Sequence, residues 1–417
     1  MNTTVLRTSA LERFLKYVTF DTQSDPDSTA TPSTPKQLVL LDELVGELNA
    51  LGLKDAIRDD QGVVMATIPA TSKKANVPVI GILAHVDTSP EMSGANVKPI
   101  VHRAYDGKDI VLPNHPEAVL RVSEIPDLRG KAGEDIVTSS GDTLLGADDK
   151  SGIAVAMAVA EYLVRNPGIA HGAVRLAFTP DEEIGRGVRH FDVQRFGALC
   201  AYTLDGEGLG KLDCETFSAD AMNVTFRGFN THPGLATGVM VNSIKVAADF
   251  IARLPRAGLA PETTGDRDGF VHPIDVVASV DETMVKFIVR DFRTAGLAEK
   301  EALLRGLAYE AVAAWPGSGV AFDVREQYRN MREVLDRNPL VVENAREAIR
   351  RAGLTPIESQ IRGGTDGSIL SEMGLPTPNL FTGQHNFHSR LEWISAQDME
   401  KSAQAVLELI KVWEERA

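Results

Sequence analysis

Acidic residues and histidines follow several apolar runs of this 417-residue chain. The first such pair is His85 and Asp87, at the end of the strand-like run VPVIGILAHV (77–86). In an extended HxD segment both side chains point to the same face, because the strand period is two. A neutral imidazole suits zinc, and a nearby carboxylate can hold the ring through its other nitrogen. Taken alone, however, a histidine at a strand end is more often an ordinary polar residue of the fold.

Two clusters of acids come next along the chain. Asp148 and Asp149 precede an apolar helix expected at 150–165, where acids can either cap the helix or bind a cation. Three consecutive acids, 181–183, close a strand expected at 172–179. A solvated loop tolerates such a run, whereas a metal site uses it: one carboxylate binds the ion and its neighbour stays free as a general base.

Two further signals complete the set. Asp205 follows a strand expected at 199–204, and the histidines of segment 383–393 follow a strand expected at 376–382. Taken together in chain order, these segments supply a His, an Asp, a Glu, an Asp and a His, and each is expected at the end of an element of one sheet. Oxygen and imidazole ligands without thiolate suit zinc. Five ligands are too many for one four-coordinate zinc, so they predict two ions that share a bridging carboxylate and a bridging water.

The elements that must position these residues alternate between helices and near-continuous apolar strands, which predicts an α/β sheet covered on both faces. Helices are expected at 9–20, 35–51, 150–165, 338–352 and 396–415, and an irregular stretch at 90–135. Between 218 and 329 the order becomes β-α-β-β-α-β, which is the ferredoxin-like unit. We therefore expect a catalytic domain in two parts, 1–217 and 330–417, around an inserted domain at 218–329.

Composition excludes several classes of partner. The net charge is −15, from 43 basic and 58 acidic residues, which disfavours nucleic acids and anionic membranes. No apolar run approaches the roughly 18 residues of a membrane span, and the N-terminus lacks the pattern of a secretory signal. Cys200 and Cys214 are the only cysteines, which predicts a cytoplasmic protein without a disulfide framework.

Eight segments of the chain resemble, in order, the peptidase T group of the two-zinc, M20-type metallopeptidases. They are AHVDTSP (84–90), TLLGADDKSG (143–152), AFTPDEEIGRG (177–187), YTLDG (202–206), THPGLATGVMVNS (231–243), IVRDF (288–292), IRGGTDGS (361–368) and GLPTPNLFTG (374–383). The later FHSRLEW (387–393) departs from the usual form, although His388 and Glu392 keep their spacing. The resemblance implies a mixed-sheet zinc-peptidase catalytic domain with an inserted ferredoxin-like α+β lid or dimerisation-type domain.

The resemblance also implies a role for each metal-site residue. His85 and Asp205 would bind one zinc ion, Glu183 and His388 the other, and Asp148 would bridge them. The Asp148–Asp149 peptide bond is expected to be cis. Asp87 would orient His85. Glu182 would act as the general base on a zinc-bridged water and later protonate the leaving amine.

Further implied roles concern the substrate, expected to be a tripeptide that loses its N-terminal residue. His232 would stabilise the oxyanion, Asn242 would hydrogen-bond the peptide backbone, and Arg290 and Arg362 are candidates to bind its C-terminal carboxylate. Without the resemblance, His232 would be an ordinary loop histidine and the arginines surface ion-pair residues. A homodimer is expected as well. A related deacylase or carboxypeptidase acting on N-acyl amino acids is the alternative function, and a binding protein without turnover the more distant one.

Overall fold

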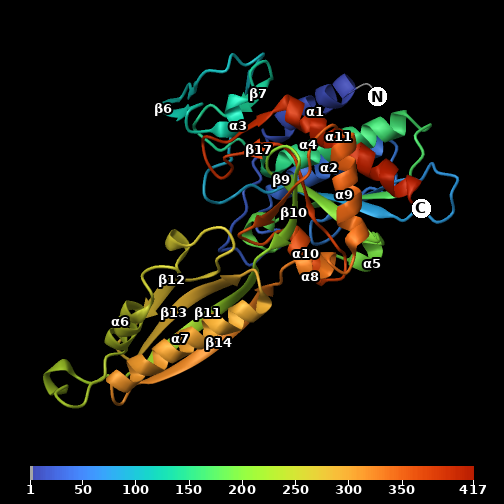
Figure 1. Ribbon diagram of the computed structural model, residues 1–417. Coiled ribbons are helices and arrows are strands. Elements are labelled where there is room, and N and C mark those ends of the chain that lie inside the picture. The colour runs from blue at the N-terminus through green and yellow to red at the C-terminus, as the bar shows by residue number, and fades with distance from the viewer. Residues whose placement is uncertain (1–2) are drawn as a thin grey trace. The chain divides into compact units, whose positions relative to one another are not determined.

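The computed structural model describes residues 3–417, which form two compact units (Figure 1). Unit 1 contains the chain up to Cys214 together with Met331–Gln360 and Thr365–Ala417, and unit 2 contains Glu215–Asn330 and Ile361–Gly364. The chain thus changes unit close to the boundaries expected after 217 and 329. The short segment 361–364, which joins unit 2, was not anticipated.

Unit 1 is built on an eight-stranded mixed sheet with the order β1-β2-β8-β3-β9-β16-β10-β15. Its central strands β8, β3, β9 and β16 are parallel to one another, whereas β2 and β10 pair antiparallel with β8 and β16. The predicted mixed α/β sheet is therefore confirmed. The bounds are β1 Ile57–Arg58, β2 Val64–Ile68, β3 Ile80–His85, β8 Val174–Thr179, β9 Cys200–Gly206, β10 Lys211–Thr216, β15 Ile357–Ile361 and β16 Asn379–Phe381.

Helices enclose this sheet. Every residue of β3 is buried, as expected for a strand with both faces covered. Helix α4 contacts β3 and β9, and α1 packs on α4 and α11. The helices of unit 1 are α1 Thr3–Tyr17, α2 Gln37–Ala50, α3 Pro126–Arg129, α4 Ala147–Arg165, α5 Val193–Phe196, α8 Arg332–Leu335, α9 Pro339–Arg351, α10 Asp366–Glu372 and α11 Ala396–Glu415, with the 3-10 turn η1 at Glu182–Ile184. Within residues 3–417, no helix combines the length and the apolar character that crossing a bilayer requires.

The expectation of an irregular stretch at 90–135 was wrong. This region holds short strands that form a hairpin, β5-β6, and part of a four-stranded sheet with the order β17-β18-β7-β4. These strands are too short for a hydrophobic period to show. Strand β5 pairs with β6 and β4 with β7, and β7 in turn pairs with β18 from the far end of the chain. The bounds are β4 Ile100–His102, β5 Ile110–Leu112, β6 His115–Leu120, β7 Ile136–Thr138, β17 Gln384–His385 and β18 Trp393–Ser395.

Unit 2 has the predicted β-α-β-β-α-β order and one antiparallel sheet, β12-β13-β11-β14. Helices α6 and α7 pack on it around a core that includes Phe226, Phe250 and Phe287. Its elements are β11 Ser218–Arg227, η2 Pro233–Leu235, α6 Ser243–Arg253, η3 Pro261–Thr263, β12 Phe270–Ala278, β13 Glu282–Asp291, α7 Thr294–Ala314 and β14 Gly319–Tyr328.

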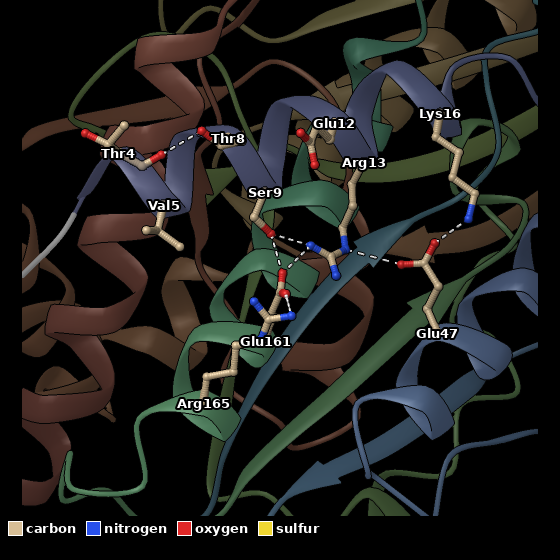
Figure 2. Close-up of a pocket in the computed structure, with 10 residues that line it drawn as sticks. All are labelled: Thr4, Val5, Thr8, Ser9, Glu12, Arg13, Lys16, Glu47, Glu161 and Arg165. Carbon is tan, nitrogen blue, oxygen red and sulfur yellow. Dashed lines mark hydrogen bonds and ion pairs between the residues drawn. The ribbon is translucent and has the colours of Figure 1, made fainter.

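A surface hollow of about 510 Å³ in unit 1 contains an ion-pair network that ties α1 to α2 and α4 (Figure 2). Arg13 of α1 lies 2.8 Å from Glu161 of α4 and 3.2 Å from Glu47 of α2. Ser9 donates to the same Glu161 carboxylate at 2.7 Å. With its side chain only 17% exposed, Arg13 satisfies two carboxylates that are themselves largely shielded from water.

We expect Arg13→Ala to lower the free energy of unfolding by about 2 kcal/mol, because it removes the cation shielded from water that both carboxylates share, and leaves Glu47 to Lys16 and Glu161 to Arg165, whose side chains are 45% and 67% exposed. The matched control is Arg165→Ala. Arg165 also pairs with Glu161, at 2.6 Å, but its side chain is 67% exposed, so its loss should cost about 0.5 kcal/mol or less. Urea unfolding of both variants measures the difference, and equal losses would show that the network adds no stability beyond a surface pair.

Candidate metal centre

The candidate metal ligands gather at one edge of the main sheet of unit 1. His85 is the last residue of β3, Asp205 lies near the end of β9, and Glu183 lies in the turn η1 after β8. These three strands are adjacent and parallel, so their carboxyl ends meet at the same edge, where ligands bind in open α/β sheets. Asp148 adds to them from the start of α4, and His388 from the loop after β17.

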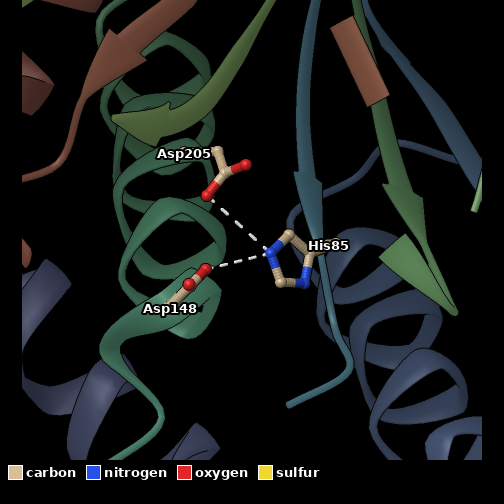
Figure 3. A group of neighbouring side chains, drawn as sticks. All are labelled: His85, Asp148 and Asp205. Carbon is tan, nitrogen blue, oxygen red and sulfur yellow. Dashed lines mark hydrogen bonds and ion pairs between the residues drawn. The ribbon is translucent and has the colours of Figure 1, made fainter. Parts of the chain in front are cut away.

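One group of possible ligands consists of His85, Asp148 and Asp205, whose ligand atoms all lie within 4.8 Å of one another. His85 Nε2 is 3.0 Å from Asp148 Oδ1 and 3.8 Å from Asp205 Oδ1. Figure 3 shows the imidazole facing both carboxylates. These are the residues expected around one of the two ions.

The second group consists of Asp148, Glu183 and His388, again with ligand atoms within 4.8 Å of one another. His388 Nε2 lies 2.8 Å from Glu183 Oε2 and 3.3 Å from Asp148 Oδ2. Asp148 therefore directs one oxygen toward each group, which is the arrangement a bridging carboxylate needs. The Asp148–Asp149 peptide bond is cis, as the resemblance predicted.

The donor atoms fit a pair of divalent cations. His85 Nδ1 donates to the carbonyl oxygen of Asp87 at 3.1 Å, which leaves the Nε2 lone pair directed at the carboxylates. Glu183 Oε1 and His388 Nε2 are buried and make no hydrogen bond among the described residues. Imidazole nitrogens and carboxylate oxygens without a thiolate are ligands that suit zinc.

The pKa shifts within the cluster also indicate a site for cations. Burial, and then the neighbouring charge of Asp148, raise the pKa of Glu183 to about 8 and that of Asp205 to about 6. Burial alone would lower the pKa of His388, but its contacts with Asp148 and Glu183 raise it to about 11. So many acids in a buried space favour positive charge, which bound cations supply.

Asp87 does more than orient His85. One of its carboxylate oxygens lies 3.4 Å from His85 Nδ1. The same carboxylate accepts hydrogen bonds from the backbone nitrogens of Glu182, at 3.0 Å, and Glu183, at 3.2 Å. Asp87 therefore holds a candidate ligand and the acidic turn in one arrangement. Sequence reasoning anticipated the first contact and missed the second.

Glu392 supports the loop that carries Asp148, a role that sequence reasoning missed. Its carboxylate accepts from the backbone nitrogens of Leu145 at 2.6 Å, Gly146 at 2.7 Å and Asp148 at 3.1 Å. The residue is 1% exposed, and burial raises its pKa to about 7. In the sequence, the feature that drew attention to Glu392 was its fixed spacing from His388. It gave no hint of a partner more than 240 residues away along the chain.

Glu91 and Asp149 are two further supporting residues; Glu91 was not considered from the sequence, and Asp149 was considered there only as a helix cap or a cation ligand. A carboxylate oxygen of Glu91 lies 3.3 Å from His388 Nδ1, the ring nitrogen opposite the one that faces Glu183. Asp149 is fully buried and accepts from the backbone nitrogen of His85 at 3.2 Å. The contact of Glu91 with His388 is of the usual kind, in which a ligand histidine is held through its second ring nitrogen, whereas Asp149 holds the backbone of His85.

Glu182 lies beside the ligands but makes no side-chain hydrogen bond among the described residues. Its Oε2 is 4.0 Å from His85 Nε2. Burial raises its pKa well above the ordinary value, and the charges of Asp205 and Asp366 add to the increase. A carboxylate with a raised pKa and a free oxygen can accept and return a proton.

The four candidate substrate-binding residues all belong to unit 2. His232 is exposed, and its Nδ1 accepts from the backbone nitrogen of Gly234 at 3.1 Å, which leaves Nε2 available. Asn242 caps α6, because its side-chain oxygen accepts from the backbone nitrogen of Ile244 at 3.0 Å. Asn242 thus has a structural role that the sequence analysis did not consider.

The two candidate arginines are also engaged within unit 2. Arg290 lies over the Tyr328 ring at 5.5 Å and donates to main-chain oxygens of its own sheet. Arg362 donates to the carbonyl oxygens of Asp266 at 3.0 Å and Asp268 at 2.8 Å. Both guanidinium groups therefore have internal partners, and their roles toward a substrate stay predictions.

Comparison with known proteins gives three kinds of match. The model of peptidase family M20/M25/M40 matches residues 144–412. Peptidase T of Geobacillus sp. (strain WCH70) is 47% identical over 412 residues, covering 99% of this chain and 100% of the relative. Peptidase T of Bacillus subtilis (strain 168) is 45% identical, with the same coverage of both chains.

Solved structures agree on the fold. The aminopeptidase PepT from Bacillus cereus superposes with a TM-score of 0.75 at 23% identity, over 98% of both chains. A tripeptidase from Staphylococcus aureus gives a TM-score of 0.76 at 23% identity, over 98% of this chain and 99% of the other. A dinuclear metal-binding peptidase from Bacillus subtilis gives 0.67 at 15% identity, over 99% and 100%. From the family model and the full-length relatives together, this chain belongs to peptidase family M20/M25/M40, and within it to the peptidase T group.

Proposed function

We propose that this protein is a two-zinc aminopeptidase that releases the N-terminal residue from tripeptides. The observation that carries the proposal is the pair of ligand groups joined at Asp148, with the unbonded carboxylate of Glu182 beside them. The full-length relatives named peptidase T and the tripeptidase that shares the fold support the choice of substrate.

The proposed mechanism assigns a task to each residue of the centre. His85 and Asp205 would hold one zinc ion, Glu183 and His388 the other, and Asp148 both. Two bound zinc ions would lower the pKa of a shared water and polarise the first peptide carbonyl. Glu182 accepts the proton of that water on a carboxylate oxygen and later donates it to the leaving amine nitrogen. Asp87 and Glu392 keep these groups in place.

Residues of unit 2 complete the proposal. His232, with its free Nε2, would donate a hydrogen bond to the oxygen that becomes negative in the transition state. Asn242 would bond the substrate backbone. Arg290 and Arg362 are proposed for the C-terminal carboxylate, although each has partners of its own.

Two broader expectations remain part of the proposal. Cys200 and Cys214 are free and buried, which suits a cytoplasmic protein. The edge strand of the unit 2 sheet, β12, carries the exposed side chains of Ile274, Val276 and Val277. A second copy of the chain could pack against this edge to form the predicted homodimer.

The decisive assay uses a matched set of peptides: Ala-Ala, Ala-Ala-Ala, Ala-Ala-Ala-Ala and N-acetyl-Ala-Ala-Ala, each with and without a chelator. We expect release of N-terminal alanine mainly from the free tripeptide, and loss of activity on chelation that zinc restores. A preference for the acetylated peptide would instead favour the deacylase alternative. Equal cleavage of all free lengths would remove the restriction to tripeptides.

A further inference from the structure

Apart from Glu182 and Asp366, the buried carboxylates around the metal centre that are not candidate ligands have their oxygens occupied by donors of the chain. Asp87 and Asp149 each accept two backbone N–H groups, and Glu392 accepts three. Asp181 accepts from the backbone nitrogen of Ser33 at 2.6 Å and from Gln37 Nε2 at 2.7 Å. Such saturated carboxylates hold the fold in place and have no oxygen left for a ligand.

Asp366, the first residue of α10, is different. It is 5% exposed, and its Oδ2 accepts from Thr179 Oγ1 at 2.8 Å. Its Oδ1 accepts no hydrogen bond, and no lysine, arginine or histidine of the described chain lies within ion-pair distance of it. Asp366 Oδ1 is not among the fully enclosed atoms that lack a partner, so this oxygen, which has no donor from the described chain, is open to solvent or to a ligand.

The carboxylate of Asp366 lies in the neighbourhood of the general base. Thr179, which binds it, is paired in register with His85 on the adjacent parallel strand. The carboxylate also lies against Gly187, where an added Cβ would stand 2.7 Å from Oδ1. Its charge contributes to the raised pKa of Glu182, and burial, together with nearby acids, raises the pKa of Asp366 itself to about 7. Asp366 is nevertheless in neither ligand group.

We propose that Asp366 binds the N-terminal ammonium group of the peptide substrate. This inference rests on the proposed aminopeptidase function, since only a substrate with a free N-terminus carries a cation at that point. An ammonium group has three N–H donors and a positive charge, which supply what Oδ1 lacks. An N-acylated substrate offers neither, so Asp366 is the residue that makes the site select free amines.

The test compares Ala-Ala-Ala with propionyl-Ala-Ala, which is the same molecule without the amino group. Asp366→Asn keeps the volume and an acceptor for Thr179 but removes the charge. We expect kcat/KM for Ala-Ala-Ala to fall about 10- to 100-fold, mainly through KM. For propionyl-Ala-Ala, kcat/KM, or the inhibition constant where turnover is too slow, should change less than about twofold. The zinc content should be unchanged.

Asp181→Asn is the matched control, because Asp181 is a buried acid next to Glu182 whose oxygens are saturated. It should leave the ratio between the two substrates at the wild-type value. Equal losses for both substrates in Asp366→Asn would overturn the proposal and make Asp366 a support of the acidic turn. If Asp366→Asn does not fold, Asp366→Ser, which also removes the charge, is judged by the same ratio.

The wild-type enzyme tests the underlying function separately. A wild-type preference for propionyl-Ala-Ala would contradict the aminopeptidase proposal before any variant is made. A wild-type preference for Ala-Ala-Ala that survives in Asp366→Asn would contradict only the assignment of Asp366.

Discussion

Glu182→Gln should lower kcat by about 1,000-fold while the protein retains both zinc ions. The amide has nearly the same shape as the carboxylate but cannot take a proton from water. Glu182 is in neither ligand group and its side chain makes no hydrogen bond among the described residues, so the replacement should leave the ligands and the backbone bond to Asp87 in place. Steady-state kinetics on Ala-Ala-Ala and metal analysis of the same dialysed sample measure the two effects together.

The neighbouring Glu183→Gln is the control for this prediction. Glu183 is a proposed ligand that lies 2.8 Å from His388, so its loss should lower the zinc content as well as the activity. The two adjacent glutamates should thus separate catalysis from metal binding. Full activity of Glu182→Gln with both ions bound would refute its role as the base, and loss of zinc from it would make it a ligand.

The second large effect is expected at Asp148. Asp148→Ala should remove zinc from both sites and reduce turnover to the background, because this carboxylate contributes to both ligand groups. The affinity for each ion should fall by more than about 100-fold, since even the loss of a supporting residue costs about 10- to 100-fold. Competition with a chelator of known zinc affinity measures both sites.

Asp205→Ala provides the comparison, because Asp205 belongs to one group only. It should lower the affinity of one site strongly and that of the other much less. A single-site loss in Asp148→Ala would contradict the bridging role and assign Asp148 to one ion. In both variants, unchanged thermal unfolding of the apo forms would show that the effects belong to the site.

The candidate site could largely be found from the sequence because its residues follow strands. His85, Glu183 and Asp205 each come directly after or at the end of an apolar run, and parallel neighbouring strands bring such ends together. The ferredoxin-like order of unit 2 could also be predicted from the sequence, because its strands are nine or ten residues long and its helices are longer. Regular elements of this length carry a clear hydrophobic pattern.

The supporting contacts could not be predicted in this way. Asp366 and Thr179 are 187 residues apart, and nothing local to either residue indicates the other. The bonds of Glu392 to the Asp148 loop and those of Arg362 within unit 2 are of the same kind. Motifs identify residues that perform chemistry, whereas the partners that position them depend on how distant segments pack.

The order of strands in the main sheet has a consequence for biosynthesis. β9 ends at Gly206, yet its parallel neighbour β16 begins only at Asn379, after unit 2 has been made. A ribosome adds about 5–20 residues per second. Most of unit 2 is one continuous stretch of chain, so it can fold before β16, which completes the main sheet of unit 1, has been synthesised. His388 and Glu392 emerge later still. If His388 is a metal ligand as proposed, the nascent chain lacks a complete metal centre until synthesis is almost finished, and we expect the unfinished chain to be inactive on the ribosome.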